Sequence, residues 1–464
     1  MFAVVGHPNK GKSSIVATLA GDDSVRIGSD PGTTSRCRHY PMKVDGEVLY
    51  VLVDTPGFQR PHKALEWMDE HETTAAKHPE VVQEFVTSHH PTDEYPDECE
   101  LLSPIVDGAG ILYVVDGSVP YGPEYEAEMK ILLWTGRPRM GLINPIGPAD
   151  YIEDWRTALG QYFSVVRVFN ALHSGFHKRI ELLRAFGELQ ENWRPALDLA
   201  VQSLQADREQ RRKRAANVLA DVLCSMLTHS VEARLRPDSD IDRERARLVD
   251  LYHRDLRRME ARSRDRIEEI YDHNRVDREE PALGALRPDE LFAQQTWSVF
   301  GLGKRQLLGL GAVGGAAAGG VVDAAVGGTS FFLGALVGSA VGVASSYWGG
   351  RKLAETKIQS IPLGGKQLVV LPSHNVNFPH VVFNRARVHH ALIAGRTHAE
   401  RGALDLSRDA ATVATPLSDA QRRSLEQMFR RIRKGADGVS AAESLATAIV
   451  SILEQDDQAR PNGL

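Results

Sequence analysis

The stretch that constrains this chain most begins at its sixth residue and reads Gly6-His7-Pro8-Asn9-Lys10-Gly11-Lys12-Ser13. It follows the apolar run 2–5 and precedes the helix-like run 14–19. A strand, a glycine-rich loop and a helix in this order form a phosphate-binding loop. The glycines let successive backbone N–H groups converge on phosphate oxygens, and the helix start adds the positive end of its dipole. A chance glycine-rich turn is the alternative, but both flanks favour the phosphate-binding loop.

This loop predicts which residues would hold a nucleoside triphosphate. Lys12 would reach the terminal phosphates, and the Ser13 hydroxyl would bind magnesium. Backbone N–H groups of the loop would contact the remaining phosphate oxygens. The nucleotide-binding residues expected here are Gly6, Asn9, Lys10, Gly11, Lys12, Ser13 and Ser14.

A second motif stands at the end of an apolar run. Residues 40–44 and 48–53 have the composition of two strands, and the second ends in Asp54-Thr55-Pro56-Gly57. In enzymes with a phosphate-binding loop, an Asp at this place supports magnesium, and the Gly donates its N–H to the γ-phosphate. Between the two motifs lies a Thr-rich loop, residues 31–36. A Thr that completes the magnesium shell only when the γ-phosphate is present would make this loop a switch.

Together these motifs resemble those of the TrmE–Era group of translation-factor-type GTPases, over roughly residues 1–190. The resemblance rests on the loop at 6–13, on Pro31-Gly32-Thr33-Thr34-Ser35-Arg36 and on Asp54-Thr55-Pro56-Gly57-Phe58. It implies an α/β fold with a doubly wound sheet, and hydrolysis of GTP to GDP and phosphate. Magnesium would be held by Ser13, Thr34 and Asp54, with Thr33 the second choice for the switch ligand. Catalysis would rest on Lys12, Thr34 and Gly57.

Two further positions bear on the rate of hydrolysis. Asn9 matches the loop asparagine that, in the potassium-dependent members of the group, helps to hold a monovalent cation beside the phosphates. Such a cation would supply the positive charge that an arginine finger gives elsewhere. Phe58 stands where Ras-type enzymes carry a water-positioning Gln, and a phenyl ring cannot orient water by hydrogen bonding. We therefore expect slow intrinsic hydrolysis, with the missing function supplied by a cation, by another residue such as Gln59, or by dimerisation.

The motif that would recognise the base is incomplete. A predicted strand over 140–144 ends in Asn144-Pro145-Ile146-Gly147, where the group has Asn-Lys-x-Asp. The missing Asp would accept two hydrogen bonds from guanine, so its loss should weaken discrimination against adenine. Asp150 is a candidate substitute. Ala171 follows the predicted strand 165–169 and matches the residue whose N–H contacts the base, so guanine remains favoured by the resemblance and by Asn144.

The whole chain is too long for one core. Its 464 residues suggest two or three domains. We expect a GTPase domain at 1–193, a charged helical region at 194–300, an apolar hairpin at 301–355 and a small C-terminal α/β region at 356–464. The net charge of −6 gives no global basic field for nucleic acid. Three scattered cysteines and a phosphate-binding loop in place of a signal peptide predict an intracellular protein of a reducing compartment.

Within the first domain, residues 62–104 read as an insertion. Runs 64–77 and 80–88 predict helices, followed by a loop rich in Pro and acidic residues. The run 110–116 predicts a buried strand and 124–134 a helix. Several histidines and one cysteine fall in the insertion, but none has the spacing that a zinc site favours, so a mobile loop after the second switch is preferred to a metal site.

The charged region 194–300 has apolar residues at helical spacing, which predicts a helical bundle or a long antiparallel hairpin. Its basic cluster Arg211-Arg212-Lys213-Arg214 could contact RNA or lipid phosphates. Acidic residues surround the cluster, so a solvated helix face is the favoured interpretation.

The least ordinary segment is 306–350, which carries one charge, Asp323, in 45 residues. Two triplets of glycines spaced by four, at 311–319 and 334–342, would let two helices approach closely. Basic residues flank both outer ends, which suits a hairpin entering a membrane from the cytoplasmic side. The first arm, at 307–322, is short for a membrane span, and Asp323 would be costly at depth. A membrane hairpin and a glycine-zipper hairpin within a soluble fold therefore both remain open.

The C-terminal part has weaker signals. Runs 367–371 and 381–383 predict strands, and 386–401, 417–433 and 440–455 predict helices. Histidines in 386–401 allow a metal site, which is again the less favoured interpretation. The succession of a GTPase-like domain, a charged helical region and an apolar segment resembles bacterial GTPases with a C-terminal domain of unknown function.

Three functions remain open from the sequence. The first is a GTP-hydrolysing switch whose C-terminal half is its effector, in the cytoplasm or at the cytoplasmic face of the inner membrane through 306–350. The second, from the resemblance, is a cytosolic GTPase of tRNA modification or ribosome maturation, against which the chain shows no RNA-binding module. The third is a nucleotide-binding structural protein with negligible turnover. A guanine nucleotide is the expected ligand, and a homodimer is one way to complete the site.

Overall fold

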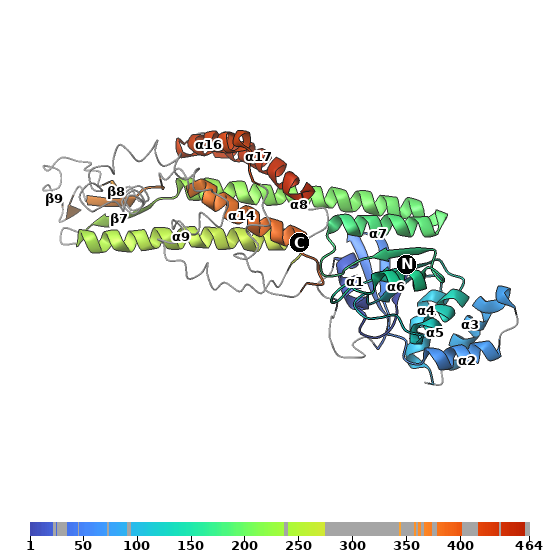
Figure 1. Ribbon diagram of the computed structural model, residues 1–464. Coiled ribbons are helices and arrows are strands. Elements are labelled where there is room, and N and C mark those ends of the chain that lie inside the picture. Colours follow the sequence, from blue (N-terminus) through green and yellow to red (C-terminus); the bar gives the residue numbers. More distant parts are fainter. Residues whose placement is uncertain are drawn as a thin grey trace.

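Figure 1 shows a computed structural model of the chain. The described residues are 1–21, 25, 35–44, 46–71, 74–90, 94–235, 240–273, 343–344, 357–358, 361–362, 366–373, 378–400, 416–435 and 438–459. They form an α/β body from the N-terminal part and an elongated, mainly helical body, which meet end to end (Figure 1).

The α/β body is built on a six-stranded sheet. Its strands are β1 (Phe2–Val5), β2 (Arg38–Val44), β3 (Glu47–Asp54), β4 (Gly110–Val115), β5 (Arg139–Ile143) and β6 (Val165–Val168). Their order is β2-β3-β1-β4-β5-β6, and all neighbours are parallel except β2 and β3, which form an antiparallel hairpin. β1 and β4 are buried throughout, as expected for central strands covered on both faces. The predicted α/β sheet is thereby confirmed.

Two apolar cores cover the two faces of this sheet. Successive residues of β1 alternate between them, because Phe2 and Val4 belong to one core and Ala3 and Val5 to the other. The first face carries α1 (Lys12–Ala20) and α7 (Phe176–Leu189). The second carries α5 (Glu124–Trp134), α6 (Ile152–Leu159) and the helices of the insertion.

The insertion is mostly helical. It forms α2 (Pro61–Glu70), a short 3-10 helix (Ala75–Lys77), α3 (His78–His89) and α4 (Pro96–Val106). The single helix predicted over 64–77 is therefore broken, and the loop predicted before residue 104 is wrong where α4 stands. α4 begins with a proline and carries Asp97 and Glu98 in its first turn. Those are signals of a helix start, which the Pro- and acid-rich composition concealed.

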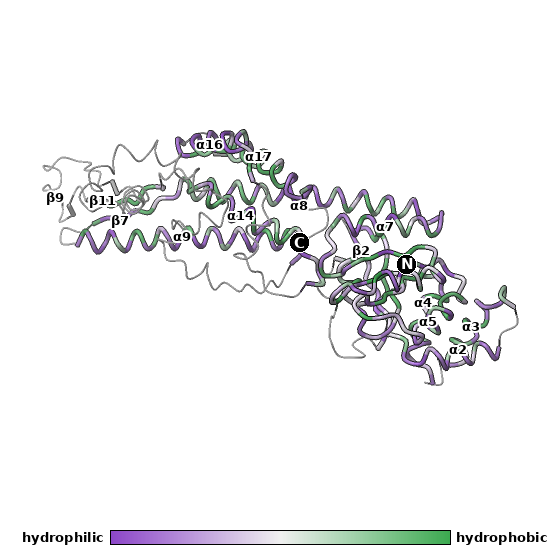
Figure 2. The backbone as a smooth tube through the Cα atoms, viewed as in Figure 1, coloured by the Kyte–Doolittle hydropathy of each residue, from purple (hydrophilic) through white to green (hydrophobic). Residues whose placement is uncertain are grey.

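The helical body is organised around two long antiparallel helices, α8 (Arg194–Thr228) and α9 (Ile241–Ile270), joined through β7 (Val231–Leu235). Three later helices pack on them: α14 (Phe378–Gly395), α16 (Asp419–Arg433) and α17 (Gly438–Gln458). Short strands complete this body: β8 (Val343–Ala344), β9 (Lys357–Ile358), β10 (Ile361–Pro362) and β11 (Lys366–Val370), the last lying between β7 and β8. Hydrophilic and hydrophobic residues are mixed along both α8 and α9 (Figure 2). In α9 the buried residues recur at helical spacing, as expected of a helix with one buried face.

α8 belongs to both bodies. Near its start, Leu197, Ala200, Val201 and Leu204 join the core on the α1 face of the sheet. From Ala215 onward its apolar residues join the core of the helical body, which also contains residues of α9, β11, α14, α16 and α17. This second core contains residues from both sides of the domain boundary expected near residue 356. The C-terminal helices and α8 therefore bury each other's apolar side chains.

The structure corrects two further predictions. Residues 381–383, expected as a strand, lie in α14, because this helix is buried almost all round and its apolar run shows no helical period. β7 interrupts a region in which the sequence predicts only helices. The predicted helices 417–433 and 440–455 are confirmed as α16 and α17.

Most of the glycine-spaced segment 306–350 lies outside the described residues. The hairpin predicted there likewise falls outside the described residues. The two residues of this segment that are described form β8 rather than helix. In the part of the chain that the structure describes, no helix combines the length and apolar character needed to span a membrane.

Candidate nucleotide-binding site

The loop between β1 and α1 has the backbone geometry that its glycines predict. Gly6 and Gly11 have φ angles of 143° and 83°, in the region that favours glycine, and Asn9 has a φ of 59°. A Cβ on Gly6 would collide with the carbonyl oxygen of Val114, and one on Gly11 with the side-chain amide of Asn144. The loop therefore packs so closely on β4 and β5 that no larger residue fits at either position.

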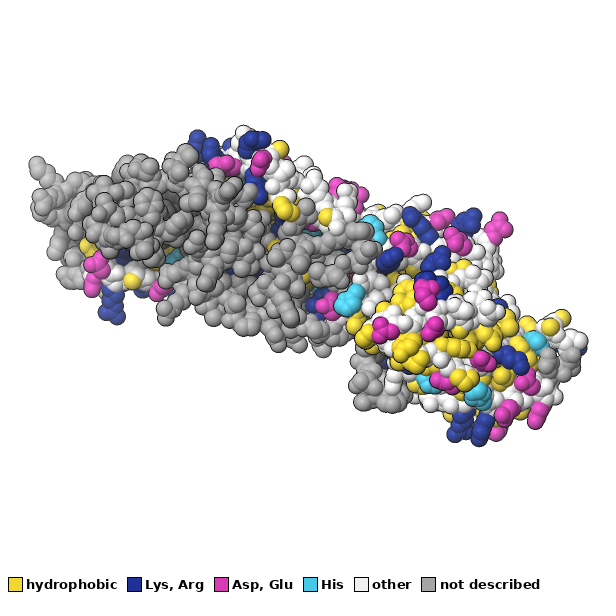
Figure 3. Space-filling view, viewed as in Figure 1, with side chains coloured by type: hydrophobic (Ala, Val, Ile, Leu, Met, Phe, Trp, Pro, Cys, Tyr) yellow, Lys and Arg dark blue, Asp and Glu magenta, His cyan; other side chains and the backbone are white. Residues whose placement is uncertain are grey.

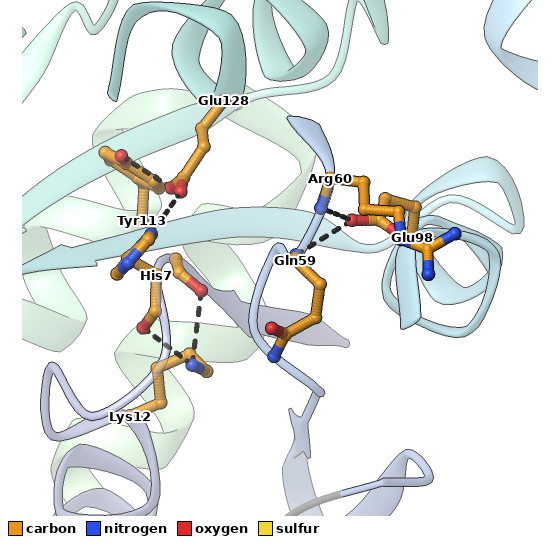
Figure 4. A network of polar contacts seen from close by, with 8 residues as sticks. His7, Lys12, Gln59, Arg60, Glu98, Tyr113 and Glu128 are labelled. Atoms are coloured by element: carbon orange, nitrogen blue, oxygen red, sulfur yellow. Dashed lines mark hydrogen bonds and ion pairs between the residues drawn. The ribbon is translucent and has the colours of Figure 1, made fainter. Parts of the chain in front are cut away.

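Lys12 lies at the centre of this loop. Its ammonium donates hydrogen bonds to the carbonyl oxygens of Gly6 at 3.2 Å and His7 at 3.0 Å (Figure 4). Burial lowers the pKa of Lys12 to about 8, against the opposing attraction of Asp54 and Glu128. The loop thus holds a desolvated cation on backbone carbonyls, which are weaker partners than phosphate oxygens.

Ser13 and Asp54 come together at the ends of α1 and β3. The Ser13 hydroxyl donates to Oδ2 of Asp54 at 2.8 Å, and Asp54 is 2% exposed. The neighbouring Thr55 donates its hydroxyl to the carbonyl oxygen of Val4 at 2.8 Å, which fixes the end of β3 against β1. A hydroxyl and a carboxylate side by side at the phosphate loop are the oxygen ligands that magnesium prefers. The expected third ligand, Thr34, and its alternative Thr33 lie outside the described residues.

Behind the loop stands a polar group that the sequence does not predict. Nδ1 of His7 lies 2.9 Å from Oε1 of Glu128, and the hydroxyl of Tyr113 donates to Oε2 of the same carboxylate at 2.9 Å (Figure 4). Glu128 is fully buried, and burial raises its pKa although His7, Tyr113 and Lys12 oppose the shift. The carboxylate holds the loop at His7 and adds negative charge behind Lys12.

The segment where the second switch is expected begins at Gly57, beside the phosphate loop. A Cβ on Gly57 would lie 2.7 Å from the backbone nitrogen of Pro8, and the N–H of Phe58 donates to the carbonyl oxygen of Gly6 at 3.4 Å. The ring of Phe58 is fully buried in the core beneath the insertion helices. Its side chain therefore packs away from the nucleotide site, whereas Gln59 beside it is exposed.

α4 of the insertion contacts both segments on which the sequence predicts a switch. Glu98, 1% exposed, accepts hydrogen bonds from the backbone N–H groups of Gln59, at 2.8 Å, and Arg60 (Figure 4). Glu100 accepts from the N–H of Cys37 at 2.7 Å, just after the Thr-rich loop, and the Cys37 thiol donates to the Glu100 carbonyl oxygen at 3.0 Å. Hydrogen bonds from α4 therefore link the insertion to both of these segments.

The two residues expected to contact the base, Asn144 and Ala171, bond to one another. Asn144, 3% exposed, donates from its amide to the carbonyl oxygen of Lys10 at 3.2 Å and accepts from the N–H of Ala171 at 3.1 Å. Asn144 therefore ties the phosphate loop to the loop after β6, and the Ala171 N–H would reach a base only by leaving this bond. Gly147 and Asp150 are both exposed.

Several histidines of the insertion and of α14 have structural partners. His71 stacks on Trp67 and His78 on Trp134, while His389 lies 3.0 Å from Glu268 and His390 lies 2.9 Å from the Tyr271 hydroxyl. Among the described residues, no group of three or more His, Cys, Asp or Glu side chains is placed to hold a metal ion.

The basic cluster 211–214 is also bonded within the protein. Arg211 pairs with Asp207 and Asp272, Arg212 with Asp457, and Lys213 with Glu209, while Arg214 donates to Gln210. On the face shown in Figure 3, basic and acidic side chains of the described residues are interspersed. This arrangement agrees with the helix-face interpretation of the cluster.

The strand order, the loop around Lys12 and the Ser13–Asp54 pair define a nucleotide-binding domain of the P-loop GTPase class. Residues 1–120 match the model of a family described as 50S ribosome-binding GTPase, and this part of the chain is a GTPase domain of the Era/TrmE type. The chain belongs to the family described as Domain of unknown function (DUF3482), whose model matches residues 156–450.

Similarity to individual relatives is confined to short stretches. The chain is 41% identical over 68 residues to GTPase Der of Aeromonas hydrophila subsp. hydrophila, or 15% of this chain and 13% of the relative. It is 45% identical over 65 residues to GTPase Der of Lactobacillus helveticus, or 14% of this chain and 15% of the relative. The chain thus spans only a small part of the length of these relatives. A crystal structure of an Aquifex aeolicus Era variant bound to GDP.AlF4- matches with a TM-score of 0.26 and 16% identity, over 58% of this chain and 89% of that one.

Proposed function

We propose that the N-terminal domain binds GTP with magnesium and hydrolyses it to GDP and phosphate as a conformational switch. The observation that carries this proposal is the convergence of the Lys12 ammonium and the Ser13–Asp54 pair at the start of α1. Phosphate oxygens would replace the two loop carbonyls as partners of Lys12, because a charged acceptor binds an ammonium more strongly than a neutral one.

Magnesium would lie at Ser13 and Asp54, where it neutralises charge that builds up on the phosphates. Thr34 would join it from the first switch and Gly57 would donate its N–H to the γ-phosphate. The close approach of Gly57 to Pro8 supports this role, since it places the second switch beside the phosphate loop. Loss of the γ-phosphate would remove both contacts and release the two switches.

Asn9 would assist as a ligand of potassium beside the phosphates. Its side chain is exposed on the phosphate loop and its backbone is left-handed, so its amide oxygen is available to a bound cation. This role also fits the burial of Phe58, which leaves the second switch without a water-orienting side chain at that position.

A binding and turnover experiment tests the proposal. The full chain is titrated with GTP and with ATP, with and without magnesium, and phosphate release is followed in potassium and in sodium buffers. We expect magnesium-dependent binding that favours GTP, and faster release in potassium. Equal affinity for ATP would refute the choice of guanine. Identical rates in the two salts, also in an Asn9→Ala variant, would refute the cation role.

For the other half of the chain we propose an effector role with membrane contact through 306–350. The single charge in 45 residues of this segment supports it. The internal pairing of residues 211–214 argues against an RNA partner at that cluster. Sedimentation of the full chain with vesicles of anionic phospholipid, compared with a variant lacking 306–350, tests the proposal. Equal sedimentation of the two chains would refute it.

A further inference from the structure

A cavity of about 170 Å³ lies where the two bodies meet, apart from the nucleotide site. The α/β body lines it with the end of α1, with part of β2 and with the start of α7. The helical body lines it with the middle of α8, with the residues that follow α9 and with the end of α14. Three of these segments follow directly on nucleotide-binding loops, because α1 follows the phosphate loop, β2 the Thr-rich loop and α7 the base loop.

The lining of this cavity has an excess of positive charge. Its Lys and Arg side chains are Lys43, Arg179, Arg208, Arg211 and Arg396, against two carboxylates, Asp207 and Asp272. Both carboxylates are already engaged by one guanidinium, because Arg211 lies 2.6 Å from Asp207 and 2.7 Å from Asp272. Arg208 is paired with Asp457 at 3.1 Å, and Arg396 lies 3.7 Å from Glu400, although neither of these acids lines the cavity. Among the described residues, Lys43 and Arg179 are the cations of the lining without an ion pair.

Arg179 is the clearest of these cations. One terminal nitrogen of its guanidinium lies 3.1 Å from the sulfur of Met42, which is a weak acceptor. Its buried Nε has no hydrogen-bond partner among the described residues. A guanidinium has five N–H donors, and a buried donor without an acceptor is costly. An anion in the cavity would satisfy it.

Three further features of the lining suit an anion. α7 begins at this wall, and it has neither a capping side chain nor an acidic residue in its first turn. Its free N–H groups therefore add positive potential beside Arg179. Lys43 is exposed from β2 on the same side. On the opposite side the guanidinium carbon of Arg208 lies over the ring of Phe176, 4.5 Å from its centre.

We propose that this cavity binds a small phosphate-type anion, of the size of phosphate or pyrophosphate, between the two bodies. Arg179 and Lys43 would contact it from the GTPase domain, and Arg208 and Arg396 from the helical body. The cavity is well below the range of roughly 300–1,000 Å³ that holds drug-sized ligands, so a whole nucleotide does not fit. The site is independent of the proposed GTPase activity, because it shares no residue with the nucleotide site.

Titration calorimetry with pyrophosphate, in EDTA so that no metal chelates it, tests this site. The phosphate loop also binds phosphates, so the full chain is compared with a Lys12→Ala variant that disables the loop. We expect Lys12→Ala to retain one pyrophosphate site. We expect the double variant Lys12→Ala with Arg179→Gln to lose at least about tenfold in affinity for it, since a charged hydrogen-bond partner is removed. Lys178→Gln, on the neighbouring residue that does not line the cavity, is the matched control and should leave the affinity unchanged.

Two outcomes would overturn the proposal. One is the complete loss of pyrophosphate binding in Lys12→Ala, which would assign all binding to the phosphate loop. The other is binding in Lys12→Ala that neither Arg179→Gln nor Lys43→Gln weakens. Lys43 is exposed, so its replacement should leave the fold intact even where the change at Arg179 does not. Because Lys12→Ala removes the nucleotide function in every arm, failure of the GTPase proposal would not affect the result.

Discussion

The GTPase domain and the helical body both bury charged groups, but the partners of these groups differ. In the GTPase domain, Lys12 is held by backbone carbonyls of a loop that a ligand can displace. In the helical body, Arg387 is paired with Asp456, and Arg385 and Arg264 share Glu260 at 2.9 and 2.7 Å. Arg385 and Arg387 come from α14, Asp456 from α17, and Glu260 and Arg264 from α9, so two of these ion pairs join different helices.

This difference separates the two roles. Ion pairs across helices join α14 to α9 and to α17, and each of their carboxylates already accepts from a guanidinium. Charges balanced by exchangeable carbonyls are available to a ligand. In the function proposed above, the chemistry would lie in the GTPase domain and the transmission of its state in the helical body.

The largest expected effect tests the first half of this contrast. Lys12→Ala should lower kcat/KM for GTP by about 10³-fold, because a preorganised donor to the developing phosphate charge is lost. Phosphate release measures it, and circular dichroism verifies the fold. Lys213→Ala is the matched control, since this exposed lysine of α8 lies outside the nucleotide site. A drop of less than tenfold for Lys12→Ala would contradict the role of this residue.

The second effect tests the buried ion pairs of the helical body. Glu260→Gln should lower the free energy of unfolding by about 3 kcal/mol, because two buried guanidiniums lose their shared carboxylate. Burial alone would raise the pKa of Glu260, but Arg385 and Arg264 lower it from 4.5 to about 2. Its contribution is therefore full above pH 4.5 and is lost as the pH falls towards 2.

Urea denaturation of the full chain at several pH values measures the effect of Glu260→Gln. The matched control is Asp250→Asn, on an exposed carboxylate of the same helix, which should change the free energy of unfolding by less than about 0.5 kcal/mol. If both variants lose equally little at pH 7, the charge cluster does not hold the helices together.

The third effect concerns the hydrogen bonds between Glu98 of the insertion and the segment where the second switch is expected. Glu98→Ala leaves the N–H groups of Gln59 and Arg60 without their acceptor, which should cost about 2 kcal/mol. We expect kcat to fall about thirtyfold with little change in affinity for GDP, since Glu98 positions the switch and does not touch the nucleotide. Glu98→Gln keeps an acceptor oxygen and should restore most of kcat, whereas Asp97→Asn, one residue away, should have no effect. Failure of Glu98→Gln to restore the rate would contradict a positioning role.

The smallest effect is a pH dependence of nucleotide affinity. Bound phosphates favour the charged form of Lys12, whose pKa in the free protein is about 8. Binding then takes up a proton above pH 8, so the Kd for GTP should rise by about tenfold between pH 7 and pH 9. Fluorescence titrations with a labelled nucleotide measure this change in Kd, and circular dichroism confirms that the chain is folded at pH 7 and at pH 9. An affinity that stays constant over this range would show that Lys12 remains charged throughout.

The sequence predicted the parts of the molecule that depend on local pattern. All six strands of the sheet follow apolar runs, and the pairing of Ser13 with Asp54 follows from motif spacing. The helix α14 was misjudged at 381–383 because a helix buried all round has no amphipathic period. The Glu128 support of His7 lies 121 residues away in the chain, and Glu98 lies 39 residues from Gln59. Contacts of this kind depend on tertiary packing, and no local signal marks them.

One consequence concerns the mechanics of α8, whose 35 residues begin in the core of the sheet and end in that of the helical body. A helix of this length is about 52 Å long. Pivoting by only 5° about its GTPase end would carry the far end through roughly 5 Å. The nucleotide domain would then act as the short arm of a lever, so a rearrangement of a few tenths of an ångström beside the phosphates would become a displacement the size of a helical turn at the opposite pole of the molecule.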